Sequence, residues 1–334
     1  MNDKVAIVGA TTWGTTLAIV LARKNIPVIL LARTVAEAAE LKSRRRNMRF
    51  LPDTPFPDSL AVAHEVEKAI APARLVIVAV PSHRLRENVQ GIRFSINPET
   101  TILSATKGLE LPAGKRMSQV LQEELPPHLH PNICVLSGPN LAKEILRGMP
   151  ASTVVAGSDA GRVEEAQSVL MSQAFRVYTS DDVVGVELAG ALKNIIVLGA
   201  GIADGLKAGD NAKSAFITRG LAEITRLGIA AGAQPLTFAG LAGLGDLVAT
   251  CASKLSRNRY VGEQLAKGKN WPEISKSMDN VAEGVNTTRA ALALSAGLGV
   301  EMPITQVTYR VLFEGLSPRE AAAELMERPA RSEW

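Results

Sequence analysis

The chain has 334 residues, of which 46% are hydrophobic, 21% charged and 4% aromatic. This length favours two domains, and the composition is that of a folded globular protein rather than a disordered or fibrous one. The formal net charge of +4 is weak evidence for nucleic acid as a partner, so none is expected.

The first half of the chain alternates apolar runs with segments of helical periodicity. Strands are predicted at 5–9, 28–31, 75–80, 101–105, 133–136, 153–156 and 175–178. Continuous apolar strands separated by helices are typical of a parallel sheet covered on both faces. An α/β domain with a Rossmann-type, doubly wound sheet is therefore predicted for residues 1–181.

After residue 181 the strand signals end, and glycines and prolines punctuate helical segments at their expected caps. Helices are predicted at 183–203, 212–227, 235–241, 257–267, 287–298, 304–313 and 318–327. Residues 182–334 are thus predicted to form an all-α domain that binds the substrate. A ligand is expected in the cleft between the two domains.

The most apolar stretch, 183–206, contains Glu187, Lys193, Asn194 and Asp204. A membrane span rarely carries so many polar groups, and the N-terminus lacks the pattern of a secretory signal. A cytoplasmic protein without membrane insertion is expected.

The two cysteines, Cys134 and Cys251, lie far apart and form neither a disulfide framework nor a zinc motif. Cys134 lies in an apolar run and is predicted to be a buried strand thiol. His128 and His130 lie in a proline-rich segment typical of a surface turn, so no metal site is expected.

A glycine turn follows the first predicted strand and opens the first predicted helix: Gly9-Ala10-Thr11-Thr12-Trp13-Gly14. In a dinucleotide fingerprint, G-x-G-x-x-G, the helix N-terminus binds the pyrophosphate. Thr11 stands where the second glycine is expected. Its β-carbon would shift the pyrophosphate, or its hydroxyl would hydrogen-bond to it. Dinucleotide binding is favoured over a purely structural turn.

The end of the second predicted strand is where such a domain recognises the ribose. Here Arg33 follows the strand, and the first acidic residue is Glu37. Arg33 suits a 2′-phosphate or stacking on adenine, which favours NADP(H) over NAD(H), although NAD(H) stays open. The alternative is a surface arginine. The basic run at 44–46, with Arg49, is interpreted as a solvated helix end or a phosphate contact.

Lys193 lies in an otherwise apolar helix. A buried ammonium needs a partner or a lowered pKa, and a lowered pKa suits a general acid that protonates a reduced ketone. The alternative is a structural lysine paired with Glu187 or Asp204. The residues alone leave both interpretations open.

Polar residues also follow two predicted strands, at the edge where open α/β sheets bind ligands. Lys107 comes after 101–105, and Gly138 and Asn140 come after 133–136. Gly138 would let a substrate approach the backbone. Asn140 would contact substrate or cap the helix that follows.

Two segments of the predicted helical domain add charge. Ser256 is expected to cap a helix whose start, with Arg257, would bind a phosphate. Asp246 lies in a glycine-rich turn and could orient a lysine. Together these residues predict a cationic site for a small phosphorylated ketone.

These motifs, in this order, resemble those of the bacterial NAD(P)-dependent glycerol-3-phosphate dehydrogenases, nearly from end to end. The resemblance rests on the glycine turn, Asn47-Met48-Arg49-Phe50-Leu51-Pro52, Ala105-Thr106-Lys107-Gly108-Leu109-Glu110, Ser137-Gly138-Pro139, Leu192-Lys193-Asn194, Gly209-Asp210-Asn211, Thr218-Arg219-Gly220-Leu221-Ala222-Glu223, Ala242 to Asp246 and Ser256-Arg257-Asn258-Arg259.

The resemblance implies reversible reduction of dihydroxyacetone phosphate to sn-glycerol 3-phosphate for glycerophospholipid synthesis, in a homodimer, with Lys193 as the general acid/base. The implied substrate contacts are Lys107, Gly138, Asn140, Lys193, Asp246, Ser256, Arg257 and Asn258. The implied cofactor contacts are Gly9, Thr12, Trp13, Gly14, Arg33, Lys107, Ala142, Arg257, Val281 and Glu283.

The chain departs from the family pattern at two positions. Thr11 replaces the usual glycine, and Asn140 stands where the family usually has Ser or Thr. Two rival interpretations are a β-hydroxyacid dehydrogenase or ketopantoate-type reductase, which would prefer a carboxylate substrate, and a non-catalytic nucleotide-sensing protein.

Overall fold

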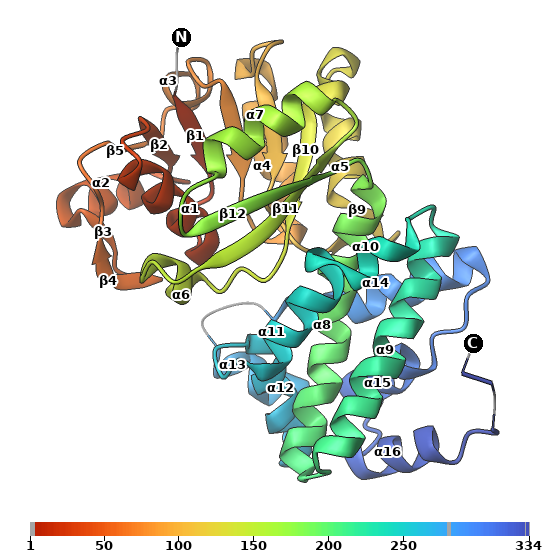
Figure 1. The fold of residues 1–334 in the computed structure, drawn as a ribbon. Helices are drawn as coiled ribbons and strands as arrows, with labels where there is room; N and C mark the ends of the chain where they lie inside the picture. The colour runs from red at the N-terminus through yellow and green to blue at the C-terminus, as the bar shows by residue number, and fades with distance from the viewer. Residues whose placement is uncertain (1–3, 279–281, 331, 334) are drawn as a thin grey trace. The chain divides into compact units, whose positions relative to one another are not determined.

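A computed structural model describes residues 4–278, 282–330 and 332–333 of the chain, which divides into two compact units. The sheet unit comprises Met1–Lys107 and Arg116–Glu187, and the helical unit comprises Gly108–Lys115 and Leu188–Trp334 (Figure 1). The predicted domain boundary at residues 181 and 182 stays a prediction. The succession of a Rossmann-like sheet and a helical region, predicted above, is confirmed.

The sheet unit contains one eight-stranded sheet in the order β12-β11-β10-β7-β6-β1-β2-β5. Its strands are β1 (Val5–Val8), β2 (Val28–Leu31), β5 (Leu60–Ala63), β6 (Leu75–Val78), β7 (Thr101–Ser104), β10 (Ile133–Ser137), β11 (Ala151–Gly157) and β12 (Phe175–Ser180). A small two-stranded sheet pairs β3 (Arg46–Asn47) with β4 (Leu51–Pro55). A second pairs β8 (Leu109–Glu110), which belongs to the helical unit, with β9 (Lys115–Arg116).

Helices cover both faces of this sheet, because its central strands are apolar on both sides. In β1, Val5 and Ile7 belong to one core cluster, and Ala6 and Val8 belong to another. The first face is covered by α1 (Thr12–Arg23), α2 (Val35–Arg44), α6 (Ala142–Leu146) and α7 (Ala160–Leu170). The second is covered by α3 (Val66–Ile70), α4 (Leu85–Ile92) and α5 (Met117–Glu124). Short 3₁₀ turns are η1 (Ser82–Arg84), η2 (Arg93–Ser95) and η3 (Pro127–Asn132).

The expectation of an entirely parallel sheet was wrong at one edge. β10 and β11 pair antiparallel, with Cys134 opposite Gly157, whereas β11 and β12 are parallel to each other. After β10 the chain passes through α6 and begins β11 at the end of the sheet where β10 finishes. Neighbouring strands entered in this way run in opposite directions, and the apolar pattern of a buried strand does not reveal its direction.

The helical unit is built on α8 (Val183–Leu206), whose segment from Leu188 onward belongs to this unit. The other helices are α9 (Asp210–Ala230), α10 (Pro235–Ala239), the π-helical turn η4 (Leu241–Gly245), α11 (Asp246–Ala252), α12 (Arg257–Ala266), α13 (Trp271–Lys276), α14 (Glu283–Leu298), α15 (Pro303–Phe313) and α16 (Pro318–Met326). All seven predicted helices occur, with shifted ends, but α11 and α13 were not predicted.

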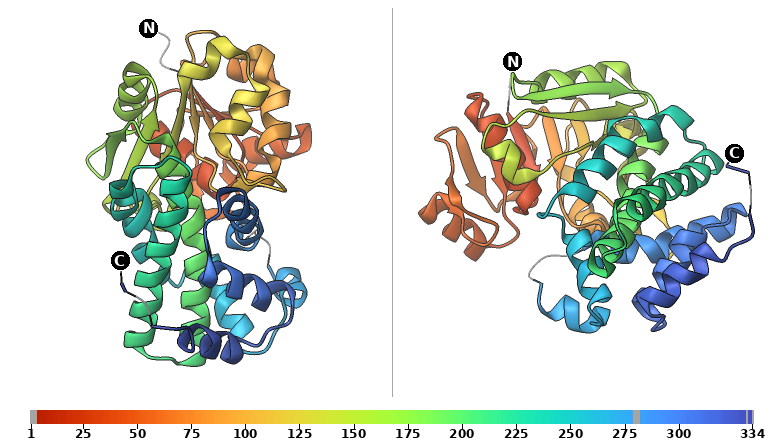
Figure 2. Two further views of the ribbon diagram at one scale, coloured as in Figure 1. Left: turned by 90° about the vertical axis from the view of Figure 1, so that its right-hand side faces the viewer. Right: turned by 60° about the horizontal axis from the view of Figure 1, so that its bottom comes forward.

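Glycines let neighbouring helices pack closely on α8. A β-carbon at Gly201 would lie 2.3 Å from the carbonyl oxygen of Arg259, and one at Gly262 would lie 2.1 Å from that of Leu198. On its other side, Gly199 accommodates the ring of Phe216, and α9 lies beside α8 in every view (Figures 1 and 2). The start of α12 is thereby fixed beside α8.

By length and composition alone, α8 and the stretch Pro235–Ala252 could each cross a membrane. In α8, 83% of the most apolar window is buried inside the protein. Its apolar surface therefore contributes to the core.

The prediction of a buried Cys134 is confirmed. The thiol lies in β10, fully buried, and burial raises its pKa to about 12. Burial also raises the pKa of Cys251, to about 11. His128 and His130 lie in the 3₁₀ turn η3, and the described residues contain no cluster of His, Cys, Asp and Glu that could hold a metal ion.

A buried carboxylate joins α9 to α15. Glu223, 1% exposed, accepts hydrogen bonds from the backbone N–H groups of Ile304 and Thr305 and from the Thr305 hydroxyl. Burial raises the pKa of Glu223, and these donors oppose the shift. It therefore satisfies groups at the start of α15 that would otherwise have no partner.

We expect Glu223→Ala to lower the free energy of unfolding by about 3 kcal/mol, because it leaves buried donors unsatisfied. Urea unfolding followed by circular dichroism measures this. The exposed Glu324→Ala serves as the control and should change the free energy by less than about 1 kcal/mol. Equal effects of the two substitutions would contradict the assigned role of Glu223.

Candidate active site

The turn between β1 and α1 can be formed only with glycine at its two ends. Gly9 has φ +111°, and a β-carbon there would lie 2.7 Å from the carbonyl oxygen of Ala79. A β-carbon at Gly14 would lie 2.1 Å from the carbonyl oxygen of Gly9. The first glycine thus permits the tight turn, and the last permits α1 to pack against it.

Thr11 adopts ordinary extended backbone angles, φ −80° and ψ 174°, and caps α1. Its hydroxyl donates to the carbonyl oxygen of Ala79 (2.7 Å) and accepts from the N–H of Gly14 (3.1 Å). A hydroxyl has one hydrogen, and this one is already used. In this arrangement the Thr11 hydroxyl donates to Ala79, and its hydrogen bond to a pyrophosphate stays a prediction.

The first turn of α1 still offers donors to an anion. The backbone N–H groups of Thr12 and Trp13 have no acceptor among the described residues, and the indole Nε1 of Trp13 is buried without a partner there. An N-terminus of this kind, on a helix of 12 residues, binds phosphate groups. These residues fit the pyrophosphate of a dinucleotide.

Arg33 lies just beyond β2 and is exposed. Its backbone N–H donates to the Glu37 carboxylate (2.7 Å), while the Glu37 N–H donates to Thr34, which caps α2. Glu37 thus orders the backbone that carries Arg33. In the basic run, Arg45 donates to backbone carbonyls of 56, 57 and 60, so it stabilises the chain locally.

Lys107 lies at the carboxyl edge of the sheet, beyond β7. Its ammonium donates to the carbonyl oxygen of Gly138, 2.9 Å away, beyond β10. Gly138 has φ +153°, and a β-carbon there would lie 2.9 Å from Thr153 Cα. The structure therefore brings Lys107 and Gly138 together.

Asn140 does not cap the following helix, so that alternative was wrong. α6 begins at Ala142 with Leu141 as its N-cap and has no side-chain cap. The Asn140 amide donates instead to the Thr153 hydroxyl (2.9 Å), because the short loop directs it toward β11. Its Oδ1 is buried without a donor among the described residues, which leaves an acceptor for a ligand hydroxyl.

In the helical unit, Lys193 is 4% exposed and ion-pairs with Asp246, Nζ to Oδ1 2.9 Å. The ammonium also donates to the hydroxyl of Thr250 (2.6 Å), which lies one turn after Asp246 on α11. Thr250 was not predicted as a site residue. Its spacing of four residues from Asp246, which puts both side chains on one face of a helix, was the signal that could have identified it. That signal was not available because α11 was not predicted.

The alternative interpretation, a structural Lys193 paired with Glu187 or Asp204, named the wrong partners. Glu187 binds Arg116 and Ser118, and Asp204 binds Lys213 and Arg259. Asp246, expected in a glycine-rich turn, is instead the first residue of α11, because η4 continues directly into that helix. Its predicted orienting contact with a lysine is present.

The start of α12 combines a side-chain cap with charge. Ser256 caps the helix by accepting from the Arg259 N–H (3.2 Å), as predicted. The backbone N–H groups of Arg257 and Asn258 have no acceptor among the described residues, and the Arg257 side chain is exposed. This helix start can bind an anion.

The Asn258 side chain is 8% exposed and joins α12 to α8 and α14. It donates to Asn194 Oδ1 (2.9 Å) on α8 and accepts from the Gly284 N–H (3.0 Å) on α14. Glu283 is the first residue of α14. Val281, the other residue implied in this segment, lies outside the described residues.

Two features define the class of this protein. It has a glycine turn after the first strand of a doubly wound sheet, and its helical unit has a buried lysine held by a carboxylate. These are features of two-unit nicotinamide-dependent dehydrogenases. Two family models match this chain: the N-terminus of NAD-dependent glycerol-3-phosphate dehydrogenase over residues 4–162, and its C-terminus over 182–323. The chain belongs to this family.

Individual proteins agree with that membership. Glycerol-3-phosphate dehydrogenase (NAD(P)+) of Dehalococcoides mccartyi is 52% identical over 99% of this chain and 92% of its own length. The crystal structure of the Coxiella burnetii glycerol-3-phosphate dehydrogenase has a TM-score of 0.92 and 37% identity, covering 98% of this chain and 99% of that one. A ketopantoate reductase from Ralstonia eutropha, 14% identical with a TM-score of 0.57 over 97% of this chain and all of that one, shares the fold alone.

Proposed function

We propose that this chain is a glycerol-3-phosphate dehydrogenase that reversibly reduces dihydroxyacetone phosphate to sn-glycerol 3-phosphate, the entry step to glycerophospholipids. The observation that carries the proposal is the buried Lys193–Asp246 pair in a chain of this family. A bound nicotinamide supplies the hydride to the ketone carbon. The residues of the chain must then supply a proton and hold the phosphate.

Lys193 supplies the proton to the carbonyl oxygen as that oxygen gains negative charge. The Asp246 carboxylate stabilises the ammonium form, which burial alone would disfavour. Thr250 accepts a second ammonium hydrogen and itself donates to the Asp246 backbone carbonyl (2.6 Å).

The substrate phosphate binds to the start of α12, where Arg257 adds a full charge to the backbone N–H groups of Arg257 and Asn258. Ser256 holds this helix start in place. Lys107 and Gly138 are further proposed substrate contacts, and Asn140 is proposed to accept from a substrate hydroxyl group through Oδ1.

The sheet unit binds the dinucleotide at the turn after β1, through Gly9, Thr12, Trp13 and Gly14. Further contacts come from Lys107, Ala142 and Arg33. The proposed cofactor contacts also include Arg257, Val281 and Glu283. We further propose that the protein acts as a cytoplasmic homodimer without membrane insertion.

The exposed guanidinium of Arg33 favours NADPH, because a 2′-phosphate can bind it bidentately. We expect Arg33→Ala to raise the Kd for NADPH about tenfold and to leave the Kd for NADH within about twofold. Fluorescence titration measures both constants, and the exposed Arg176→Ala is the control. Equal weakening for the two cofactors would contradict a role in 2′-phosphate recognition.

The experiment that tests the reaction compares substrates. Initial rates of NADPH and NADH oxidation are measured with dihydroxyacetone phosphate and with ketopantoate. We expect dihydroxyacetone phosphate to have the higher kcat/KM by at least about 10³-fold, because the α12 start favours a phosphate. A higher kcat/KM for ketopantoate would overturn the proposal and favour the carboxylate-reductase alternative.

A further inference from the structure

The turn from Gly9 to Gly14 lacks the second glycine of the dinucleotide fingerprint, but side-chain hydrogen bonds fix its conformation. Residues 9 and 14 are glycines, and residue 11 is threonine. Glycine at this place would give the backbone freedom and leave the Gly14 N–H without its present partner. Two polar side chains instead fix the turn: Thr11, within it, bonds to Ala79, and Asn47 bonds to it from a later part of the chain.

Thr11 joins the turn to the end of a neighbouring strand. Its hydroxyl donates to the Ala79 carbonyl oxygen, 68 positions later in the sequence, immediately after β6. The Thr11 hydroxyl oxygen also accepts from the Gly14 N–H, a donor of the kind that an N-cap normally satisfies. Valine has the same shape as threonine but would leave both groups without this partner.

Asn47 holds the other side of the turn. This side chain, 4% exposed, donates from Nδ2 to the carbonyl oxygen of Ala10 and to the hydroxyl of Thr15, both 2.9 Å away. Its Oδ1 accepts from the Phe50 N–H (3.3 Å). The C=O and N–H of a trans peptide point in opposite directions, so fixing the Ala10 carbonyl also fixes the direction of the Thr11 N–H.

We infer that Thr11 and Asn47 are positioning residues for the cofactor: together they hold the β1–α1 turn in the conformation that binds the pyrophosphate. The inference rests on the proposed nucleotide site at this turn. Neither side chain has to touch the cofactor. Thr11 thus compensates for the absent glycine through its hydroxyl, and its β-carbon is tolerated because its backbone angles are ordinary.

The test measures the Kd for NADPH by energy transfer from tryptophan, without substrate, together with the Tm of each variant. Thr11→Val is expected to raise the Kd about tenfold, whereas Thr11→Ser, which keeps the hydroxyl, should stay within about threefold. Asn47→Asp, which keeps the acceptor and loses the donors, should also raise the Kd about tenfold. Thr11→Gly should weaken binding as well. It restores the glycine of the fingerprint but removes the hydrogen bonds of the Thr11 hydroxyl with Ala79 and Gly14.

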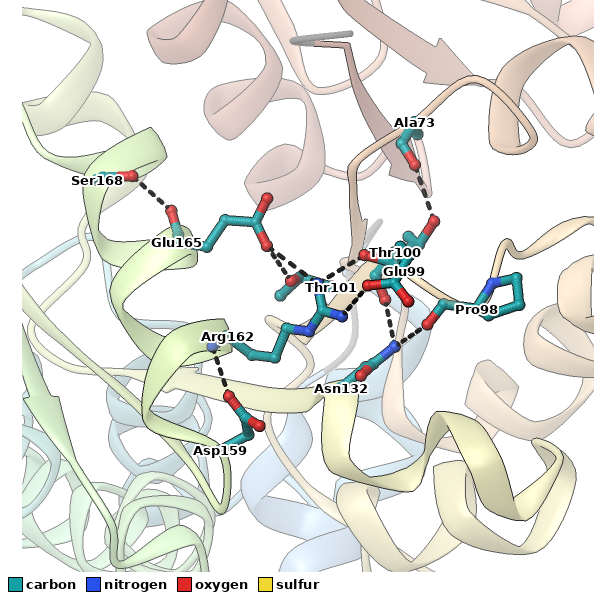
Figure 3. Close-up of polar contacts among 10 residues, drawn as sticks. All are labelled: Ala73, Pro98, Glu99, Thr100, Thr101, Asn132, Asp159, Arg162, Glu165 and Ser168. Atoms are coloured by element: carbon teal, nitrogen blue, oxygen red, sulfur yellow. Dashed lines mark hydrogen bonds and ion pairs between the residues drawn. The ribbon is translucent and has the colours of Figure 1, made fainter. Parts of the chain in front are cut away.

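A matched control lies in the polar cluster at the start of β7 (Figure 3). There the buried hydroxyl of Thr100 donates to the Ala73 carbonyl oxygen (2.9 Å), and Asn132 donates to the backbone of 98 and 100. Thr100→Val removes a bond of the same kind and should lower the Tm while leaving the Kd within about twofold.

Two results would overturn the inference. One is tighter NADPH binding by Thr11→Gly, which would mean that Thr11 only obstructs the site. The other is a Thr11→Val variant that loses Tm like Thr100→Val but keeps the parent Kd. Because no substrate is present, a parent protein that binds NADPH but does not reduce dihydroxyacetone phosphate would refute the proposed reaction and leave this inference intact.

Discussion

Lys193→Ala is expected to lower kcat with dihydroxyacetone phosphate by about 10³-fold, because the carbonyl oxygen would lose its positioned proton donor. The Kd for NADPH should stay within about twofold, since Lys193 is proposed to act on the substrate and its observed partners are Asp246 and Thr250. Steady-state rates at saturating substrates and a fluorescence titration measure the two quantities.

Lys213→Ala provides the matched control. This lysine lies in the same unit and ion-pairs with Asp204 at 2.8 Å, but it has no place in the proposed chemistry. Its kcat should remain within about twofold of the parent. Residual activity of Lys193→Ala within tenfold of the parent would argue against proton transfer by Lys193.

Arg257→Ala is expected to raise KM for dihydroxyacetone phosphate about 10²-fold, because a charge-assisted contact to the phosphate is lost. For unphosphorylated dihydroxyacetone, at NADPH concentrations that saturate each variant, the same substitution should change kcat/KM by less than about threefold. The ratio of kcat/KM for the two ketones therefore isolates the phosphate contact from general damage to the site.

Arg259→Ala is the control for this variant. Arg259 lies two residues further along α12, but its guanidinium pairs with Asp204 (2.8 Å) and Glu263 (3.2 Å). It should destabilise the protein without changing the preference for the phosphorylated ketone. An equal loss of preference in both variants would show that Arg257 acts only through the structure of α12.

The sequence predicts most of the fold because its strands are short, apolar and separated by helical segments. It does not predict the direction of β11, which depends on where the chain re-enters the sheet. It also does not predict α11. The glycine-rich residues of η4 indicate a turn, but they form a π-helical turn that continues into the helix.

The site was predicted in part. A lone lysine in an apolar helix identified Lys193, but its partner is 53 positions away, and only the packing of α11 against α8 selects Asp246 and Thr250. The role of the Thr11 hydroxyl could not be predicted either, because its acceptor, Ala79, is close only after the sheet has formed. Contacts of this kind depend on tertiary structure and leave no local pattern.

The most direct test of the whole account is product analysis. The purified protein is given NADPH and dihydroxyacetone phosphate, and the product is assayed for sn-glycerol 3-phosphate and for its enantiomer. We expect one NADPH to be consumed for each sn-glycerol 3-phosphate formed, with none of the enantiomer. Binding of NADPH without oxidation in the presence of dihydroxyacetone phosphate would contradict it.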